Sequence, residues 1–128
     1  MEFTLKTTFK AAAKQIFDAW LNSESHSEMT GGEAQTSNEV GAKFYAWDGY
    51  IEGTNLVIEP NSRIAQTWRT SEFEANDEDS QIEVLFSEKD GSTELTLIHT
   101  GLSESGEQYI NGWKEHYFAP MKENFGEK

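Results

Sequence analysis

Residues 103–125 constrain the fold most strongly, because their pattern predicts a long helix with one broad aromatic face. Apolar residues recur there every three or four positions, the spacing that keeps side chains on one side of a helix. They are Ile110, Trp113, Tyr117, Met121 and Phe125. A helix this bulky on one face needs a large apolar surface to cover it. The strands predicted earlier in the chain are the candidate for that surface.

Serine and proline residues indicate how this helix begins and where its course changes. Ser103 or Ser105 is a suitable N-terminal cap, since a serine hydroxyl accepts a hydrogen bond from a free backbone N–H. Pro120 lies within the helical pattern, where it has no N–H to donate to the carbonyl of His116 and its ring crowds the preceding turn. We therefore expect a kink or a short break at Pro120, followed by a final turn over residues 121–125.

The rest of the chain predicts an antiparallel sheet that helices interrupt once. Alternating apolar and polar residues predict strands over Glu2–Phe9, Lys43–Trp47, Tyr50–Glu59, Arg63–Thr70, Gln81–Glu88 and Thr93–Thr100. After the first strand, Lys10–Asn22 has a helical stripe, and Ser23–Thr30 predicts a short helix or turn that a glycine pair ends. Asp90-Gly91 is typical of a two-residue hairpin. Because the strands are grouped, the predicted fold class is α+β, with about six or seven strands.

Length, composition and charge exclude several classes of protein. We expect a single domain over residues 1–128, which is enough chain for one core. The absence of cysteine excludes disulfides and cysteine-ligated metal. A net charge of −13 with no basic stripe argues against nucleic acid or an anionic membrane as a partner. No apolar run reaches the roughly 18 residues of a membrane span, and no signal layout is visible, so we expect a cytoplasmic protein.

Several short segments, in order along the chain, resemble those of one known family. They are FDAW (17–20), GAKFYAW (41–47), GYIEG (49–53), QTWR (66–69), TELTLIHTG (93–101) and Gly112-Trp113. Together they make the chain similar, over essentially its whole length, to the activator of heat-shock protein 90 ATPase homologue-like family. That family belongs to the START-like, or SRPBCC, superfamily, which includes birch-pollen allergen-like proteins and polyketide cyclases.

The resemblance implies a helix-grip fold, in which a curved antiparallel sheet wraps around a long C-terminal helix and two short helices close one end. It also implies a cavity for a hydrophobic small molecule between sheet and helix. The family name implies a chaperone link. In the eukaryotic activators, however, this fold is one domain of a larger chain, and the domain that binds the chaperone has no room in 128 residues. We therefore expect the chaperone link to be weak.

The inward faces of the strands and of the final helix supply candidate ligand-binding residues. The candidates are Phe44, Tyr50, Ile51, Gln66, Trp68, Phe86, Leu97, His99, Tyr109, Trp113 and Tyr117. The aromatic side chains would supply contact area, whereas His99, Gln66 and Tyr50 would orient the ligand. The alternative is that these side chains simply fill a core, but so many aromatics are hard to close-pack without a void. Gly112 would widen such a cavity or let the helix approach the sheet.

His99 has two interpretations. Its position in the strand places it inward with Leu95 and Leu97, where a neutral imidazole orients a ligand or acts as an acid or base. The alternative is a buried histidine that a backbone carbonyl or a Tyr hydroxyl satisfies. Of the other histidines, we expect His116 at the rim of the pocket and His26, in the polar stretch SESHSE, exposed to solvent.

The sequence contains no recognisable catalytic motif, since it lacks a nucleophile elbow, a phosphate loop, a dinucleotide fingerprint and a paired-histidine zinc motif. We therefore predict no metal, no cofactor and no catalytic residues. We expect a monomer or homodimer that binds a small hydrophobic or aromatic molecule. Two alternatives stay open: a cyclase, dehydratase or hydrolase that uses His99, and a stress-linked co-chaperone that docks through the acidic segment Glu72–Asp79.

Overall fold

The computed structural model describes residues 1–126, apart from the side chains of Glu104 and Ser105. Its strands form one six-stranded antiparallel sheet in the order β1-β6-β5-β4-β3-β2. They are β1 (Phe3–Phe9), β2 (Lys43–Ala46), β3 (Ile51–Glu59), β4 (Arg63–Thr70), β5 (Ser80–Lys89) and β6 (Ser92–Thr100). The predicted α+β class and antiparallel meander are confirmed, with six strands. Asp90 and Gly91 both have positive φ, at 53° and 79°, which is the predicted hairpin turn.

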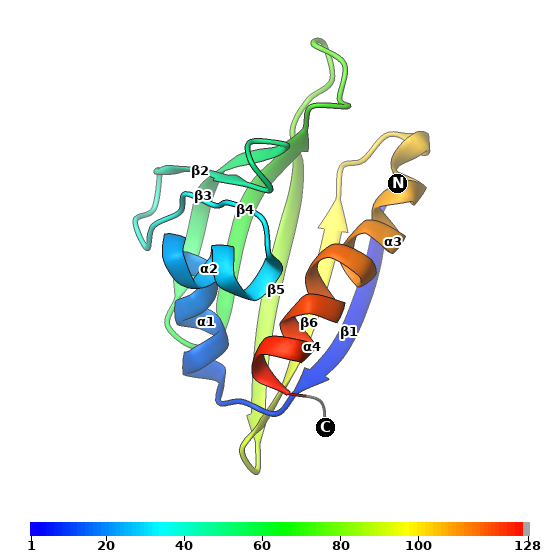
Figure 1. Cartoon of the computed structure of the whole chain (residues 1–128). Helices are drawn as coiled ribbons and strands as arrows, with labels where there is room; N and C mark the ends of the chain where they lie inside the picture. Colours follow the sequence, from blue (N-terminus) through cyan, green and yellow to red (C-terminus); the bar gives the residue numbers. More distant parts are fainter. Residues whose placement is uncertain (127–128) are drawn as a thin grey trace.

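The helices lie on one face of the sheet (Figure 1). Helices α1 (Ala13–Leu21) and α2 (Ser23–Thr30) join β1 to β2. The C-terminal helix consists of a 3₁₀ turn, Glu104–Glu107, then α3 (Gln108–Trp113), a π-helical turn, Lys114–Phe118, and α4 (Ala119–Phe125). In Figure 1 this helix runs diagonally in front of β5, β6 and β1, with α1 and α2 beside it. None of the described helices has the length and apolar character needed to cross a bilayer.

The expected break at Pro120 is wrong, because the helix continues through this residue. The backbones of Phe118 and Ala119 are right-handed helical, and the N–H of Ala119 donates to the carbonyl of Lys114, five residues back. A π-helical turn is wider than an α-turn. We attribute the continuity to this turn, which accommodates the missing N–H and the ring of Pro120 without ending the helix.

The predicted aromatic face of this helix needs one correction. Trp113, Tyr117 and Met121 are buried as expected, but Tyr109 is buried while Ile110 is only half-buried. Both positions lie within one turn of Trp113, so spacing alone does not separate them. Tyr109 takes the inner place because its ring packs edge-on against Trp68 of β4, at 5.0 Å between centroids.

Strand β3 contains a glycine that the packing requires. A Cβ atom on Gly53 would lie 1.9 Å from the carbonyl oxygen of Thr67 and 2.6 Å from the ring of Phe44. Next to it, the N–H of Thr54 donates to the hydroxyl of Thr67 at 2.8 Å. The register between β3 and β4 then shifts between Asn55 and Val57. Gly53 therefore lets β2 and β4 approach β3 more closely than any other residue would allow.

We predict that Gly53→Ala lowers the free energy of unfolding by about 2–4 kcal/mol, because the new methyl group meets backbone that has no room to move. Gly112→Ala is the matched control, since a Cβ there meets no atom within 4 Å. That variant should be unchanged or more stable by up to about 1 kcal/mol, because alanine favours a helix over glycine. Urea unfolding of the two variants measures both effects. Equal stability of the two variants would contradict this account of β3.

Candidate binding pocket

A layer of stacked aromatic rings fills the middle of the space between sheet and C-terminal helix. The ring of Trp113 stacks on Trp20 at 6.2 Å between centroids, and lies 5.6 Å from Trp68 and 4.7 Å from Tyr117. All four side chains are buried. The part of the predicted cavity that lies beneath Trp113 is therefore occupied by packed side chains.

His99 is held in this layer by a chain of hydrogen bonds. The indole N–H of Trp113 donates to His99 Nδ1 at 3.1 Å. An indole nitrogen only donates, so the ring proton of His99 lies on Nε2, which donates to Ser80 Oγ at 2.9 Å. The Ser80 hydroxyl in turn donates to the carbonyl of Trp68 at 2.6 Å. Burial lowers the pKa of His99 to about 3, so the ring is neutral at pH 7.

This geometry fits the second interpretation of His99, that of a satisfied buried histidine, with a serine and a tryptophan as its partners. The ring is fully buried, and it is not among the residues that line the pocket described below. Both ring nitrogens are already hydrogen-bonded. The geometry therefore gives no support to an enzyme that uses His99 as its acid or base.

Gln66 lies inside, as its strand position predicts, but its amide bonds to the protein. The indole N–H of Trp20 donates to Gln66 Oε1 at 3.2 Å, and Gln66 Nε2 donates to Asn55 Oδ1 at 2.9 Å. Asn55 Nδ2 donates at 3.0 Å to the carbonyls of Ser37 and Glu39. These bonds join α1, β4, β3 and the loop before β2, and they leave Gln66 away from the pocket.

The expectation that His26 is exposed is wrong, because its side chain is only 3% accessible. His26 Nδ1 donates to the carbonyl of Trp20 at 2.9 Å, and the Tyr117 hydroxyl donates to Nε2 at 2.8 Å. Burial lowers the pKa of His26 to about 4. Helix α2 buries His26, Met29 and Thr30, and it packs against the C-terminal helix. The buried face of α2 is not apparent from the sequence, because the residues next to His26 are polar.

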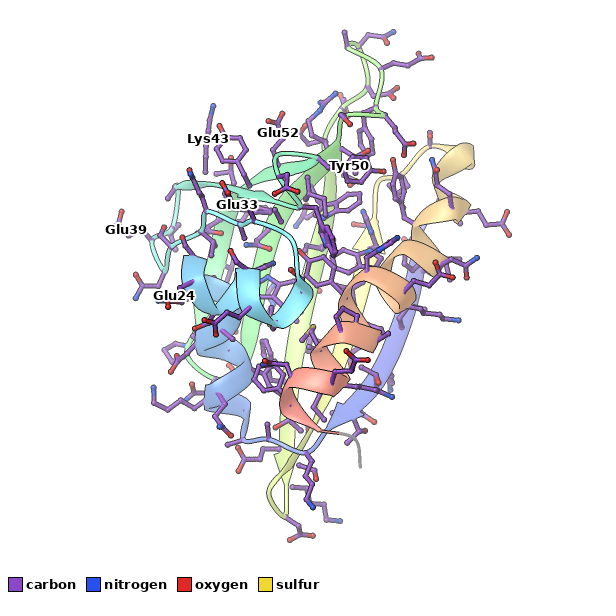
Figure 2. The ribbon with its side chains drawn as sticks, in the orientation of Figure 1. Glu24, Glu33, Glu39, Lys43, Tyr50 and Glu52 are labelled. Atoms are coloured by element: carbon purple, nitrogen blue, oxygen red, sulfur yellow. The ribbon has the colours of Figure 1, made fainter. Side chains whose placement is uncertain are left out.

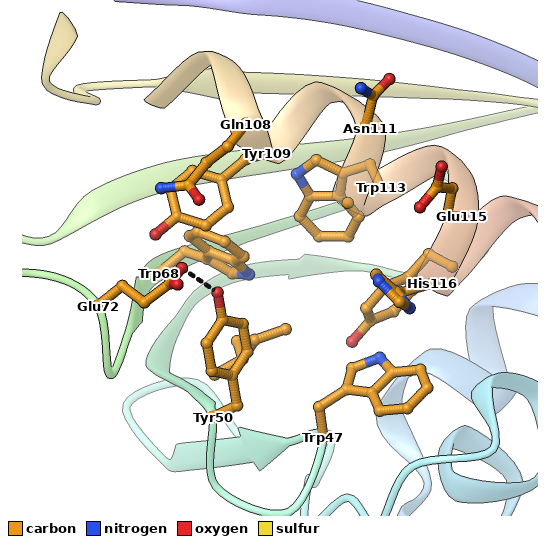
Figure 3. Close-up of a pocket in the computed structure, with 13 residues that line it drawn as sticks. Trp47, Tyr50, Trp68, Glu72, Gln108, Tyr109, Asn111, Trp113, Glu115 and His116 are labelled. Atoms are coloured by element: carbon orange, nitrogen blue, oxygen red, sulfur yellow. Dashed lines mark hydrogen bonds between the residues drawn. The ribbon is translucent and has the colours of Figure 1, made fainter. Parts of the chain in front are cut away.

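A pocket of about 440 Å³ opens beside this aromatic layer, between the C-terminal helix and the turn that joins β2 to β3 (Figure 3). Most of its wall is aromatic. The lining residues are Trp47, Tyr50, Ile51, Trp68, Glu72, Gln108, Tyr109, Asn111, Gly112, Trp113, Glu115, His116 and Tyr117. The volume lies within the range of roughly 300–1,000 Å³ that is usual for small-molecule sites.

The turn between β2 and β3 forms one wall of the pocket, and its backbone has a left-handed conformation. Trp47, Asp48 and Gly49 have φ values of 51°, 58° and 90°, in the left-handed region. Such values are costly for the first two residues, so the surrounding contacts must hold them. The ring of Trp47 packs over Gly32, where a Cβ would lie 2.4 Å away, and edge-on against His116 at 5.5 Å. Trp47 Nε1 is buried, and no described residue accepts its hydrogen bond.

Hydrogen bonds hold the polar groups at the mouth of the pocket. The hydroxyl of Tyr50 donates to the carboxylate of Glu72, as the dashed line in Figure 3 marks. The hydroxyls of Tyr109 and Thr70 share a hydrogen bond of 2.7 Å. Burial raises the pKa of both Tyr50 and Tyr109, so both phenols are neutral at pH 7.

The structure divides the sequence-derived candidates into two groups. Those that line the pocket are Tyr50, Ile51, Trp68, Tyr109, Trp113 and Tyr117. Those that lie elsewhere are Phe44, Gln66, Phe86, Leu97 and His99. Of the second group, Phe86 packs edge-on against Phe17 at 5.8 Å, and Leu97 is fully buried in the core. The second group serves the core because the pocket lies at one end of the sheet and not along its whole length.

Sequence reasoning missed part of the pocket wall. The missed residues are Trp47, Glu72, Gln108, Asn111 and Glu115. His116 lies at the pocket as expected, and Gly112 lines it with open space where a side chain would be. The missed helix positions share a face with Gly112, one or two positions from the aromatic stripe. Because these residues are polar, the sequence pattern placed them on the solvent side of the helix. The one available signal was that Gln108 and Glu115 lie three or four positions from Gly112, and so on the same helix face.

The antiparallel sheet that curves around a C-terminal helix, with a pocket at one end of that helix, defines a helix-grip protein. The sequence profile of the family described as "Activator of Hsp90 ATPase homolog 1-like protein" matches residues 10–126. The chain therefore belongs to the Activator of Hsp90 ATPase homolog 1-like family.

Individual relatives agree with this assignment. The chain is 31% identical over 124 residues to the "Activator of 90 kDa heat shock protein ATPase homolog" of Dictyostelium discoideum, covering 94% of this chain and 32% of that protein. It is 27% identical over 126 residues to the human "Activator of 90 kDa heat shock protein ATPase homolog 1", covering 98% and 37%. The chain thus spans about a third of the length of these curated relatives.

A solved structure supports the fold. The crystal structure of PFC0360w, described as an HSP90 activator from Plasmodium falciparum, superimposes with a TM-score of 0.89 at 23% identity. The match covers 98% of this chain and 96% of that one. At this level of identity, the similarity establishes the fold alone.

The two buried histidines predict a loss of stability in acid. Both have a folded-state pKa below the ordinary 6.5, so below pH 6.5 the unfolded chain binds protons that the folded chain does not. Neither histidine lowers the stability above pH 6.5. The stability loss grows as the pH falls from 6.5 toward 4 for His26 and toward 3 for His99. We predict that the free energy of unfolding drops by up to about 1.4 kcal/mol per pH unit for each histidine. Urea unfolding at pH 7, 6 and 5 measures it.

His26→Gln provides the internal control, because glutamine keeps a donor and an acceptor but does not titrate. This variant should lose about 1–2 kcal/mol at pH 7 through weaker hydrogen bonds. Its stability should then depend about half as steeply on pH between 6.5 and 5, above the range where most carboxylates titrate. An unchanged slope in His26→Gln would show that the acid sensitivity comes from other groups.

Proposed function

We propose that this chain binds a small hydrophobic or aromatic molecule in the pocket between α3 and the β2–β3 turn. The observation that carries the proposal is a pocket of about 440 Å³ whose wall includes six Trp and Tyr rings. Such rings offer a large apolar area at a low entropic cost, and their polar atoms give a ligand a fixed orientation. In this proposal, the candidate residues that line the pocket contact the ligand. Gln66 and His99 do not contact it; they hydrogen-bond to the buried side chains of Trp20 and Trp113.

The rings of the wall are already fixed before any ligand arrives. Trp113 is bonded to His99, Tyr109 to Thr70 and Tyr117 to His26. Binding to rings held in this way costs little ordering of side chains, so more of the contact energy is available for affinity. The packed layer beneath the pocket holds these rings in place without a ligand. It therefore favours a higher affinity, because no free energy is spent on opening the pocket.

Filling the pocket tests this proposal. Gly112 lies on the helix face between Gln108 and His116, which line the pocket one turn away on either side. We predict that Gly112→Phe lowers the affinity for an uncharged apolar dye, N-phenyl-1-naphthylamine, at least about tenfold, because the new ring occupies the dye's volume. Dye fluorescence titrations with the folded protein measure the effect.

Ala119→Phe is the matched control, since Ala119 is exposed on the same helix and does not line the pocket. It adds the same ring at a place where dye binding should not change. Absence of dye binding to the unaltered protein, or equal affinity of Gly112→Phe and the unaltered protein, would overturn the proposal.

A second candidate function is that of a co-chaperone acting on Hsp90. Family membership favours it, since relatives in Dictyostelium and human are named as activators of the Hsp90 ATPase. The chain matches only about a third of the length of those proteins.

Steady-state ATPase assays of purified Hsp90 with added chain test this candidate. If it is right, the ATPase rate rises with the concentration of the chain and saturates, as binding to a defined site requires. A bovine serum albumin control at equal concentration accounts for non-specific effects. An unchanged rate, together with no binding by analytical ultracentrifugation, would remove this candidate. The same sedimentation experiment determines whether the chain is a monomer or a homodimer.

A further inference from the structure

The charged groups around the pocket are almost all negative. Glu72 and Glu115 line it, and among the described lining residues His116 is the only basic side chain. The salt bridges of the described residues are Lys14–Asp18, Arg63–Glu83 and Arg69–Asp79. Glu72 and Glu115 therefore have no cationic partner in the part of the chain that the structure describes.

The rest of the molecule reinforces this negative potential. The chain has a net charge of −13. Exposed acidic side chains project from the loop before β2 and from β3, among them Glu33, Glu39 and Glu52, with Lys43 as a basic neighbour (Figure 2). Summed over the surface, such charges attract cations and repel anions that approach a cleft. An anionic ligand such as a fatty acid carboxylate would meet repulsion both on approach and inside.

In the aromatic wall next to Glu72, the ring planes meet at different angles. Tyr109 stands nearly perpendicular to Trp68, at 82° and 5.0 Å, and Trp113 is tilted by 34° from Trp68 at 5.6 Å. Figure 3 shows Tyr50, on the turn before β3, with its hydroxyl directed at Glu72. The faces of such rings carry negative potential, and boxes of Trp and Tyr bind ammonium groups without needing a hydrogen bond.

We propose that the pocket selects small organic cations, that is, protonated or quaternary amines on an apolar or aromatic body. This proposal rests on the function proposed above and adds the charge of the ligand. The ammonium group lies between the rings of Tyr50 and Tyr109 beside the carboxylate of Glu72, and the apolar body lies against Trp68 and Trp113. The hydrogen bond from Tyr50 holds the Glu72 carboxylate at the mouth, where it balances the charge of the ligand.

Three probes of nearly the same shape separate charge from size. Benzyltrimethylammonium is the cation, neopentylbenzene replaces its nitrogen by carbon, and benzylsulfonate is the anion. Each is titrated into the full chain while the indole N–H signals of Trp68 and Trp113 are followed by NMR. The cation should bind about tenfold more tightly than the neutral probe, and the anion more weakly than both. Added salt should reduce the advantage of the cation.

Glu72→Gln tests the assigned position of the charge. It keeps an acceptor for the Tyr50 hydroxyl and should lower the ratio of cation to neutral affinity about fivefold. Glu123→Gln makes the same charge change at an exposed position outside the pocket and should leave that ratio unchanged. Equal binding of the cation and the neutral probe, or tighter binding of the anion, would overturn the charge selectivity while the pocket remains a binding site. If none of the three probes shifts either indole signal, the proposed function fails as well.

Discussion

The hydrogen bond from the Trp113 indole to His99 is the constraint on which the rest of the structure depends. It ties the C-terminal helix to β6, and the bonds from His99 to Ser80 and from Ser80 to the carbonyl of Trp68 extend the connection through β5 to β4. Apolar packing alone allows a helix to slide or rotate on a sheet, because it has no direction. A buried chain of hydrogen bonds prevents such sliding, because every shift of the helix would leave a polar group unpaired.

The pocket exists because this packed layer ends abruptly. Trp113 lines the pocket together with Tyr109 and Tyr117 of the same helix, and Gly112 next to it leaves open space. On the opposite side, the left-handed turn directs Trp47 onto the backbone of Gly32, so the ring stands as a wall and does not collapse inward. The absent side chain of Gly112 adds to the open space of this pocket.

Periodicity in the sequence predicted the elements of this fold well, because burial of one face is what selects a strand or a helix. The stripe on α1 and the glycine after α2 are examples. It failed where side-chain chemistry decides the outcome. The π-helical turn before Pro120 depends on which carbonyl the N–H of Ala119 reaches, and the burial of His26 depends on a partner, Tyr117, far away in the chain. Neither contact leaves a pattern in neighbouring residues, so no local reading of the sequence could find it.

The acidic segment Glu72–Asp79 connects the two candidate functions physically. Arg69 holds it by donating to the carbonyls of Glu74 and Asp77 and to the carboxylate of Asp79. At its other end, Glu72 accepts the hydroxyl of Tyr50 at the mouth of the pocket. The segment predicted to dock a partner and the edge of the proposed ligand site are therefore one piece of chain. A cation that neutralises Glu72 would change the charge that a protein partner meets, so ligand binding and partner binding at this segment would be coupled and not independent.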